Sequence, residues 1–377
     1  MSGQRQIHAI DSDFDGGNIV VEAIEGACAQ LTIRRDTCAQ WAQWFHFKVD
    51  ADPGALVDLQ ILNAGECSYP EGWECYRACV SEDGRAWTRT ETAYVSGKLV
   101  IRHRMAGSQV QVAYFAPYGL DEHIDLLWRS TPFCAADTLA ETPGARRVDR
   151  LRFGFGPFKI WLLGRQHPGE PMASWWMEGA VRRLIEMVGV RSKFFQSASV
   201  NVVPMVNPDG VASGNLRANA RGRDLNREWA HPDPREAPEV AGILGEMSRI
   251  GVDLVLDVHG DECIPHVFLD SGQGAPNAGL SKSQTAGVAR FSKLLGARNP
   301  AFQTAVGYPR TYAGEGAAGM CARAVAARFG AVGMTLEMPF GQSKEAPDPL
   351  HGWSPEASAT LGRDCVDSLI LWLNGAC

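Results

Sequence analysis

The first hundred or so residues alternate between short apolar runs and polar turns. In several runs Val, Ile, Leu or Phe occupies every second position, and Gly, Pro and Asp separate one run from the next. Such alternation is typical of β-strands that have one buried face. It predicts strands at 19–24, 29–34, 43–49, 55–62, 98–102 and 110–118. We therefore expect an all-β antiparallel sandwich over residues 1–118.

After Tyr118 the pattern changes. A helical pattern covers 120–128, and apolar strands then alternate with amphipathic segments of helix length. Strands are predicted at 148–153, 159–163, 198–206, 252–258 and 331–336, and helices at 172–188, at 237–250 and after Ser354-Pro355. This alternation predicts an α/β fold with a mixed, mostly parallel sheet flanked by helices. The second domain is expected over residues 119–377.

Composition narrows the classes of function. The chain has 377 residues, 45% of them hydrophobic, and a net charge of −7, which disfavours nucleic acid and anionic membranes as partners. We find neither an apolar run of about 20 residues nor the apolar core of a secretory signal. The ten cysteines fit a reducing compartment as free thiols. We therefore expect a cytoplasmic protein with no nucleic-acid or membrane partner.

Candidate metal-binding residues follow three of the predicted strands. His167 and Glu170 follow the strand at 159–163, His259 follows the strand at 252–258, and Glu337 follows the strand at 331–336. Two histidines and one glutamate form a three-ligand set of the kind that binds catalytic zinc and leaves a fourth position open. Glu337 then remains as a general base for the attacking water.

Simpler interpretations exist for each of these residues. A His and a Glu three positions apart are often solvated loop residues, and a single His such as His259 is more often a core residue with satisfied hydrogen bonds. Glu337 is harder to explain in this way, because a carboxylate at the end of a buried strand is costly unless it is paired or functional.

The stretch 204–229 is rich in Asn, Gly and Arg. A solvated loop is the simple interpretation of that composition. However, Arg217, Asn226 and Arg227 are side chains that could hold a carboxylate, because a guanidinium group offers paired donors to two oxygens.

Six motifs in this order resemble those of the zinc metallocarboxypeptidases, and specifically the cytosolic carboxypeptidase subfamily. They are His167-Pro-Gly-Glu170, Asn207-Pro-Asp-Gly-Val211, Gly214-Asn-Leu-Arg217, Gly222-Arg-Asp-Leu-Asn-Arg227, Asp257-Val-His259-Gly and Thr335-Leu-Glu337. Upstream, 43–49 and 113–118 are similar to the amino-terminal β-domain of that subfamily. The resemblance thus covers nearly the whole chain.

The resemblance implies one zinc ion bound by His167, Glu170 and His259, with Glu337 activating the water. The bound substrate would be the carboxyl terminus of a peptide or protein, and its last peptide bond would be hydrolysed.

Further roles are implied for the residues between the ligands. Arg217 would polarise the scissile carbonyl and stabilise the oxyanion, while Asn226 and Arg227 would bind the terminal carboxylate of the substrate. Asp224 would hydrogen-bond His167 and fix its tautomer.

For two of the implied roles, the sequence offers more than one candidate residue. Tyr312 is the candidate for a tyrosine that caps the substrate, with Tyr308 as its alternative. Arg323 is the candidate for the basic residue that the subfamily associates with an acidic carboxyl-terminal side chain, and Arg328 and Arg310 compete with it. The acids of the stretch 257–262 depart from the family pattern, so they leave the selectivity of the pocket open.

The expected function is therefore zinc-dependent removal of a carboxyl-terminal residue, with Glu as the leading substrate. An aspartoacylase-type zinc amidohydrolase that acts on small N-acyl amino acids is the nearest alternative. A catalytically silent peptide-binding protein is the alternative from another class.

Overall fold

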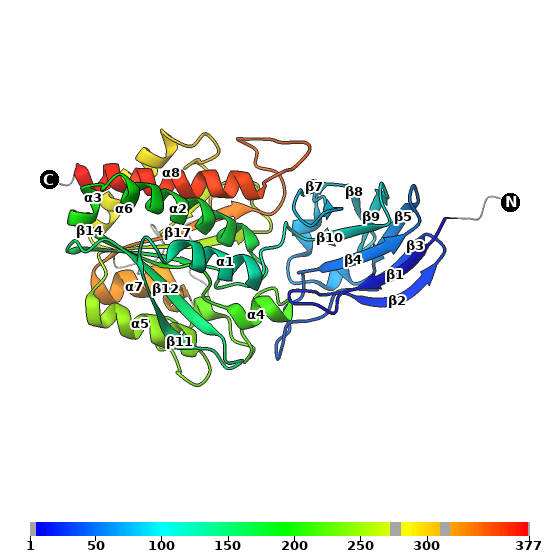
Figure 1. The fold of residues 1–377 in the computed structure, drawn as a ribbon, viewed down its shortest axis with the longest axis horizontal. Coiled ribbons are helices and arrows are strands. Elements are labelled where there is room, and N and C mark those ends of the chain that lie inside the picture. Colours follow the sequence, from blue (N-terminus) through cyan, green and yellow to red (C-terminus); the bar gives the residue numbers. More distant parts are fainter. Residues whose placement is uncertain (1–4, 272–279, 310–316, 376–377) are drawn as a thin grey trace.

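The structure, a computed structural model, describes residues 5–271, 280–309 and 317–375. Two lobes lie side by side, an amino-terminal lobe of strands and a larger lobe in which helices surround a sheet (Figure 1). The chain passes from the first lobe to the second through the helix α1 (Leu120–Ser130). Among the described residues, no helix is both long and apolar enough to cross a membrane.

The amino-terminal lobe contains two five-stranded sheets. One sheet has the order β1 (Ile7–Asp11), β4 (His46–Ala51), β10 (Gln109–Ala113), β6 (Cys79–Ser81) and β7 (Thr88–Arg89). The other has the order β2 (Val20–Glu25), β3 (Cys28–Thr32), β5 (Leu56–Ile61), β9 (Lys98–Arg104) and β8 (Glu91–Val95). Phe47 and Val49 of the first sheet belong to the same buried cluster as Leu59 and Ile101 of the second, so the apolar side of each strand faces the core.

The larger lobe is built on a seven-stranded sheet. Its order is β11 (Ala135–Glu141), β12 (Arg147–Phe153), β14 (Ala198–Val203), β13 (Phe158–Gly164), β15 (Leu254–Asp261), β17 (Val332–Pro339) and β16 (Phe268–Asp270). The four strands β14, β13, β15 and β17 run parallel. The remaining neighbouring pairs are antiparallel. Parallel strands place their carboxyl ends at one edge of the sheet, where ligands of α/β proteins bind.

Helices cover both faces of this sheet (Figure 1). Ile160 and Leu162 of β13 belong to the buried cluster that includes side chains of α2 (Pro171–Gly189), α6 (Lys282–Gly296) and α8 (Pro355–Asn374). Trp161 and Leu163 belong to the cluster that includes side chains of α5 (Pro238–Ile250) and α7 (Cys321–Phe329). Successive residues of a strand point to opposite faces, so a continuous apolar run is needed here.

Short segments complete the described chain. They are α3 (Phe194–Ser197), α4 (Pro208–Ser213) and the 3-10 helices η1 (Ala64–Glu66), η2 (Pro70–Trp73), η3 (Leu225–Arg227) and η4 (Ala317–Gly319).

The predicted fold class is confirmed, with differences in detail. In the amino-terminal lobe β3 and β5 pair in parallel, although the other pairs are antiparallel. The strands β15 and β17 continue past their predicted ends at 258 and 336, because their ladder pairs His259 with Glu337 and extends to Asp261 and Pro339. His259 and Glu337 therefore lie inside strands rather than after them.

Candidate active site

Three buried side chains converge at the carboxyl ends of β13 and β15. Nδ1 of His167 lies 2.6 Å from Oε1 of Glu170 and 3.1 Å from Nδ1 of His259. Nδ1 of His259 lies 2.8 Å from Oε2 of Glu170. Their ligand atoms all lie within 4.8 Å of one another, and each residue is at most 4% exposed.

Local structure fixes where His167 and Glu170 lie. Both belong to the turn that follows β13, and Glu170 is the N-cap residue of α2, which begins at Pro171. In this turn Arg165 has a φ of 60°, and its Nε donates to the carbonyl of Pro168 over 2.7 Å. The backbone N–H of Gly169 donates to the carbonyl of Leu216. These bonds hold a turn that a non-glycine residue at positive φ would otherwise disfavour.

A carboxylate lies behind each histidine. Nε2 of His167 is 3.1 Å from Oδ1 of Asp224, and Nε2 of His259 is 2.9 Å from Oδ2 of Asp257. A carboxylate only accepts hydrogen bonds, so each Nε2 can donate to the carboxylate that it contacts, and each Nδ1 is then free to present a lone pair to a metal ion. Two lone pairs and the Glu170 carboxylate then face one another.

This set of atoms fits a metal cation. Three acceptors at such short range repel unless a proton or a cation lies between them, and two imidazoles with one carboxylate suit zinc. The carboxylates behind the histidines are the partners that histidine ligands of zinc normally have. In the part of the chain that the structure describes, no other group of three His, Cys, Asp or Glu residues is arranged to hold an ion.

Glu337 lies beside this set on β17, where it pairs in register with His259. Oε1 of Glu337 accepts from the hydroxyl of Tyr308 over 3.2 Å, and its buried Oε2 has no hydrogen-bond partner among the described residues. Burial raises the pKa of Glu337 well above its usual range, and the charges of Glu170 and Asp261 raise it further, although His259 opposes them. An unpartnered carboxylate oxygen in this position is available to a ligand.

Arg217 and Asp224 form a buried ion pair. Nε of Arg217 donates to Oδ2 of Asp224 over 2.7 Å, and one terminal nitrogen donates to the hydroxyl of Tyr69 over 2.9 Å. Burial disfavours the ionised form of Asp224, but Arg217 and His167 outweigh it and hold the pKa of the carboxyl well below its usual range. Asp224 thus stays ionised, with one oxygen on His167 and the other on Arg217.

Asn226 and Arg227 lie on η3, next to Asp224. The Asn226 side chain accepts from the backbone N–H of Cys321 over 2.8 Å, and its Nδ2 lies 3.3 Å from Nε2 of His259. Arg227 donates to the carbonyl of Asn226, and its side chain is 28% exposed. The structure therefore brings both residues to the ligand cluster.

The competing candidates are found in different places. Tyr312 and Arg310 lie outside the described residues. Tyr308 contacts Glu337 and also donates to Oδ2 of Asp261 over 2.8 Å. Arg323 donates to Oδ2 of Asp270 on the neighbouring strand β16. Arg328 instead contacts Ser248 of α5 and is exposed.

Three further residues belong to this network although sequence reasoning gave them no role. Asp257 is two positions before His259 on the same strand, so the two side chains share a face, and that spacing was the available signal. Tyr69 and Asp36 belong to the amino-terminal lobe and contact Arg217 across 148 and 181 residues of chain. No local pattern could indicate these two contacts.

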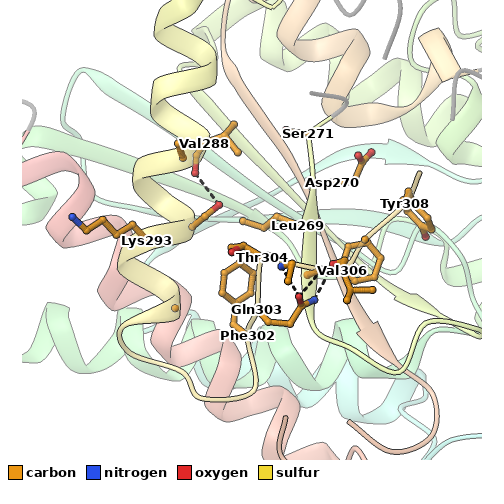
Figure 2. Close-up of a pocket in the computed structure, with 16 residues that line it drawn as sticks. Leu269, Asp270, Ser271, Val288, Lys293, Phe302, Gln303, Thr304, Val306 and Tyr308 are labelled. Carbon is orange, nitrogen blue, oxygen red and sulfur yellow. Dashed lines mark hydrogen bonds between the residues drawn. The ribbon is translucent and has the colours of Figure 1, made fainter. Parts of the chain in front are cut away.

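Two cavities are lined by residues that contact the site or are candidates for it. The first, of about 680 Å³, lies between α6, β16 and the segment 302–308 (Figure 2). Tyr308 and Asp270 line it, but His167, Glu170 and His259 do not. The second, of about 430 Å³, is lined by Arg217, Asp224 and Arg227 together with Trp41 and Tyr69 of the amino-terminal lobe. The second cavity therefore contacts Arg217, but the three candidate ligands and Glu337 do not line it either.

The fold and the site together define a metallohydrolase of the α/β class. Comparison with known proteins identifies its family. Residues 10–115 match the cytosolic carboxypeptidase N-terminal domain, and residues 138–260 match the zinc carboxypeptidase family.

Relatives of known and unknown activity agree with this match. A metallo-carboxypeptidase from Pseudomonas aeruginosa has 36% identity and a TM-score of 0.92, over 97% of this chain and 99% of that one. An uncharacterised protein of Zymomonas mobilis, ZMO1242, is 42% identical over 95% of this chain and 94% of its own. Cytosolic carboxypeptidase 1 of mouse is 34% identical over 69% of this chain, which spans only 26% of the mouse protein.

The chain belongs to the zinc carboxypeptidases, and it is a peptide hydrolase. The expectation drawn from the six motifs is thereby confirmed at the level of the family.

Proposed function

We propose that the protein binds a single zinc ion through His167, Glu170 and His259 and removes the last residue of peptides. The observation that carries this proposal is the convergence of the two Nδ1 atoms with the Glu170 carboxylate, where each histidine also contacts a second carboxylate. Beside them lies Oε2 of Glu337, which has no hydrogen-bond partner among the described residues. When bound, zinc supplies a Lewis acid that polarises a carbonyl and lowers the pKa of water.

Glu337 is the proposed proton carrier. It takes a proton from the attacking water and returns it to the nitrogen of the leaving amino acid. Burial raises its pKa, and a carboxylate with a raised pKa accepts a proton from water more readily. Because the hydroxyl of Tyr308 contacts Oε1 of Glu337, Oε2 is the oxygen that we propose receives the proton.

Arg217 is the proposed oxyanion donor, and Asn226 and Arg227 are the proposed carboxylate binders. Asp224 engages Nε of Arg217, which leaves a terminal nitrogen for the carbonyl oxygen of the substrate. Removal of one such donor costs about 10²- to 10³-fold in rate. The exposed part of Arg227 and an N–H of Asn226 would bind the terminal carboxylate and select for a chain end.

An acidic last residue is the proposed preference, with Arg323 as the basic residue of the pocket. Arg323 is contributed by α7, two residues after Cys321, whose N–H binds Asn226. Its contact with Asp270 moderates the positive charge, so we expect a preference rather than strict specificity. The Pseudomonas aeruginosa relative was solved with (2-guanidinoethylmercapto)succinic acid, a dicarboxylate that also carries a guanidino group.

Cytoplasmic activity on peptide or protein carboxyl termini completes the proposal. It rests on the names of the cytosolic carboxypeptidase relatives and on the acidic net charge of −7, which disfavours nucleic acid as a partner.

The test is hydrolysis of peptides that differ only in their last residue, Glu, Asp, Lys, Phe or Ala. The zinc-loaded protein is incubated with each peptide, and loss of one residue is followed by mass spectrometry. We expect release of Glu or Asp to be fastest and Glu337→Gln to be inactive while still binding zinc. Activity on N-acyl amino acids alone would favour the aspartoacylase-type enzyme. Peptide binding without turnover would favour a silent binding protein.

A separate experiment tests whether Arg323 determines the preference for an acidic last residue. We expect Arg323→Ala to reduce kcat/KM for the Glu peptide about tenfold or more relative to the Ala peptide. Arg328→Ala is the matched control, because Arg328 lies on the same helix but contacts α5. Equal effects of both substitutions on the Glu-to-Ala ratio would exclude Arg323 from the pocket.

A further inference from the structure

The amino-terminal lobe places one tyrosine in the candidate active site. Tyr69 precedes η2, and its ring is half-buried. Its backbone is held on both sides by the fully buried Gln43, whose Oε1 accepts from the N–H of Tyr69 over 2.8 Å and whose Nε2 donates to the carbonyl over 2.9 Å. Gln43 Nε2 also donates to the hydroxyl of Tyr114. The position of Tyr69 is therefore fixed by the core of its own lobe.

The Tyr69 hydroxyl contacts the proposed oxyanion donor. It accepts from one terminal nitrogen of Arg217 over 2.9 Å, while Nε of Arg217 donates to Asp224. The other terminal nitrogen donates to no residue that the structure describes. Tyr69 and Arg217 both line the cavity of about 430 Å³, together with Asp224 and Arg227.

The same lobe also holds the backbone of Arg217. The carboxylate of Asp36 accepts from the N–H groups of Leu216, Arg217 and Ala218 over 2.6, 2.7 and 2.8 Å. Asp36 is 4% exposed, so these bonds are shielded from water. The backbone and the side chain of Arg217 are thus both hydrogen-bonded to the amino-terminal lobe.

The hydroxyl of Tyr69 has a specific consequence for the guanidinium group. An arginine beside a carboxylate prefers a two-pronged pairing that uses Nε and a terminal nitrogen, or both terminal nitrogens. Here one oxygen of Asp224 accepts a hydrogen bond from Nε of Arg217, and its other oxygen contacts Nε2 of His167. Because Tyr69 occupies one terminal nitrogen, that nitrogen is not available to Asp224, and the last nitrogen has no partner among the described residues.

We infer that Tyr69 is a positioning residue for Arg217, so that the amino-terminal lobe supplies part of the catalytic apparatus. This inference rests on the proposed role of Arg217 in peptide hydrolysis. Loss of the hydroxyl leaves the guanidinium charged and close to the site, but free to adopt orientations that do not meet the oxyanion. The effect should therefore fall on kcat rather than on substrate binding.

The test is a double-mutant cycle in the full-length, zinc-loaded protein. We expect Tyr69→Phe to lower kcat about tenfold to hundredfold on the preferred peptide, with KM changed less than about threefold. In an Arg217→Ala background the same substitution should lower kcat less than about twofold, because its target is gone. Zinc content should equal that of the wild-type protein in every variant.

Tyr76→Phe is the matched control, since its hydroxyl is buried in the same lobe and donates to the carbonyl of Tyr114 rather than to a site residue. It should lower Tm without lowering kcat. A Tyr69→Phe protein with wild-type kcat would overturn the inference and leave the proposed function intact, as would an equal loss in both backgrounds. A wild-type protein that cleaves no peptide would overturn the proposed function itself, and the inference with it.

Discussion

At the scale of single residues, the charges behind the ligands decide what the site can bind. Asp257 is fully buried and accepts from His259, while Gln166 donates Nε2 to both of its oxygens over 2.7 Å. Trp229 in turn donates to Oε1 of Gln166, which fixes the orientation of the amide. Asp257 is therefore an obligate acceptor, and it keeps the proton of His259 on Nε2.

Asp257→Asn should weaken zinc binding about 10- to 100-fold, because an amide cannot accept from His259 and from Gln166 with both of its ends. Competition with a chromophoric zinc chelator measures this affinity. Asp253→Asn, at an exposed position just before β15, serves as the control. Unchanged zinc affinity in Asp257→Asn would show that the Asp257 carboxylate is dispensable for the tautomer of His259.

A second residue links stability to pH. Glu239 is fully buried at the start of α5, and burial raises its pKa from 4.5 to about 7, with Asn219 opposing the shift. A raised pKa in the folded state means that the folded protein holds the proton more tightly than the unfolded chain. The resulting stability is fully present below pH 4.5 and is lost as pH rises through 7.

The substitution Glu239→Gln should remove this dependence of stability on pH. When it acts in full, the pKa shift of Glu239 corresponds to about 3 kcal/mol in the free energy of unfolding. We expect the Tm of the variant, relative to the wild-type protein, to rise between pH 5 and pH 8. Glu141→Gln, at an exposed position of β11, should show no such trend. A constant Tm difference across this range would contradict the raised pKa of Glu239.

At the scale of elements, continuously apolar strands were predicted, whereas the helices α6 and α7 and several short strands were given no predicted range. The strands β13, β15 and β17 are apolar on both faces and were predicted, as were α2, α5 and the Ser354-capped α8. The strand β11 was missed because it is an edge strand whose residues are exposed or half-buried. The ends of β15 and β17 were placed too early, since polar His259 and Glu337 pair within the ladder.

The convergence of His167, Glu170 and His259 could be predicted because the three residues lie close to the carboxyl ends of apolar strands. The contacts of Arg217 with Tyr69 and Asp36 could not, since they depend on how two lobes dock. The position of Tyr312 remains a prediction, because the residue lies outside the described chain.

Close packing of two helices supports the ligand turn. The helix α2 begins directly after Glu170 and packs along α8. A Cβ at Gly179 of α2 would overlap the carbonyl oxygen of Ala359, and one at Gly362 of α8 would overlap that of Trp176. Glycine at both positions therefore sets the distance between the helices.

Gly179→Ala should destabilise the protein by about 1–3 kcal/mol or more, because the helices must separate. Gly245→Ala is the matched control: it lies inside α5 with no atom near the added Cβ, and it should stabilise by about 0.5–1 kcal/mol. Thermal unfolding of both variants distinguishes the two outcomes. Equal Tm values would contradict the close approach of α2 and α8.

At the scale of the whole molecule, the two lobes are joined by buried polar contacts. Arg89 of β7 is 6% exposed and donates to the carbonyls of Phe340, His351 and Trp353 over 2.6, 3.0 and 3.2 Å. The rings of Tyr114 and Phe340 stack at 4.4 Å between centroids. Such an interface favours unfolding of both lobes as one unit.

Arg89→Met should lower stability by about 2–5 kcal/mol, because it leaves buried carbonyls without donors. Calorimetry should show a lower Tm or two separate transitions in place of one. Arg102→Met, which removes an exposed arginine from the same lobe, should leave the transition nearly unchanged. A wild-type transition in Arg89→Met would mean that the lobes are held together without this residue.

The order of the strands also bears on biosynthesis. β17 carries Glu337 and lies between β15 and β16, although it follows both in the sequence. In a chain that grows from its amino terminus, His167, Glu170 and His259 are therefore synthesised before Glu337, the proposed base. Until β17 is inserted between β15 and β16, the proposed metal ligands would therefore lack the proposed base.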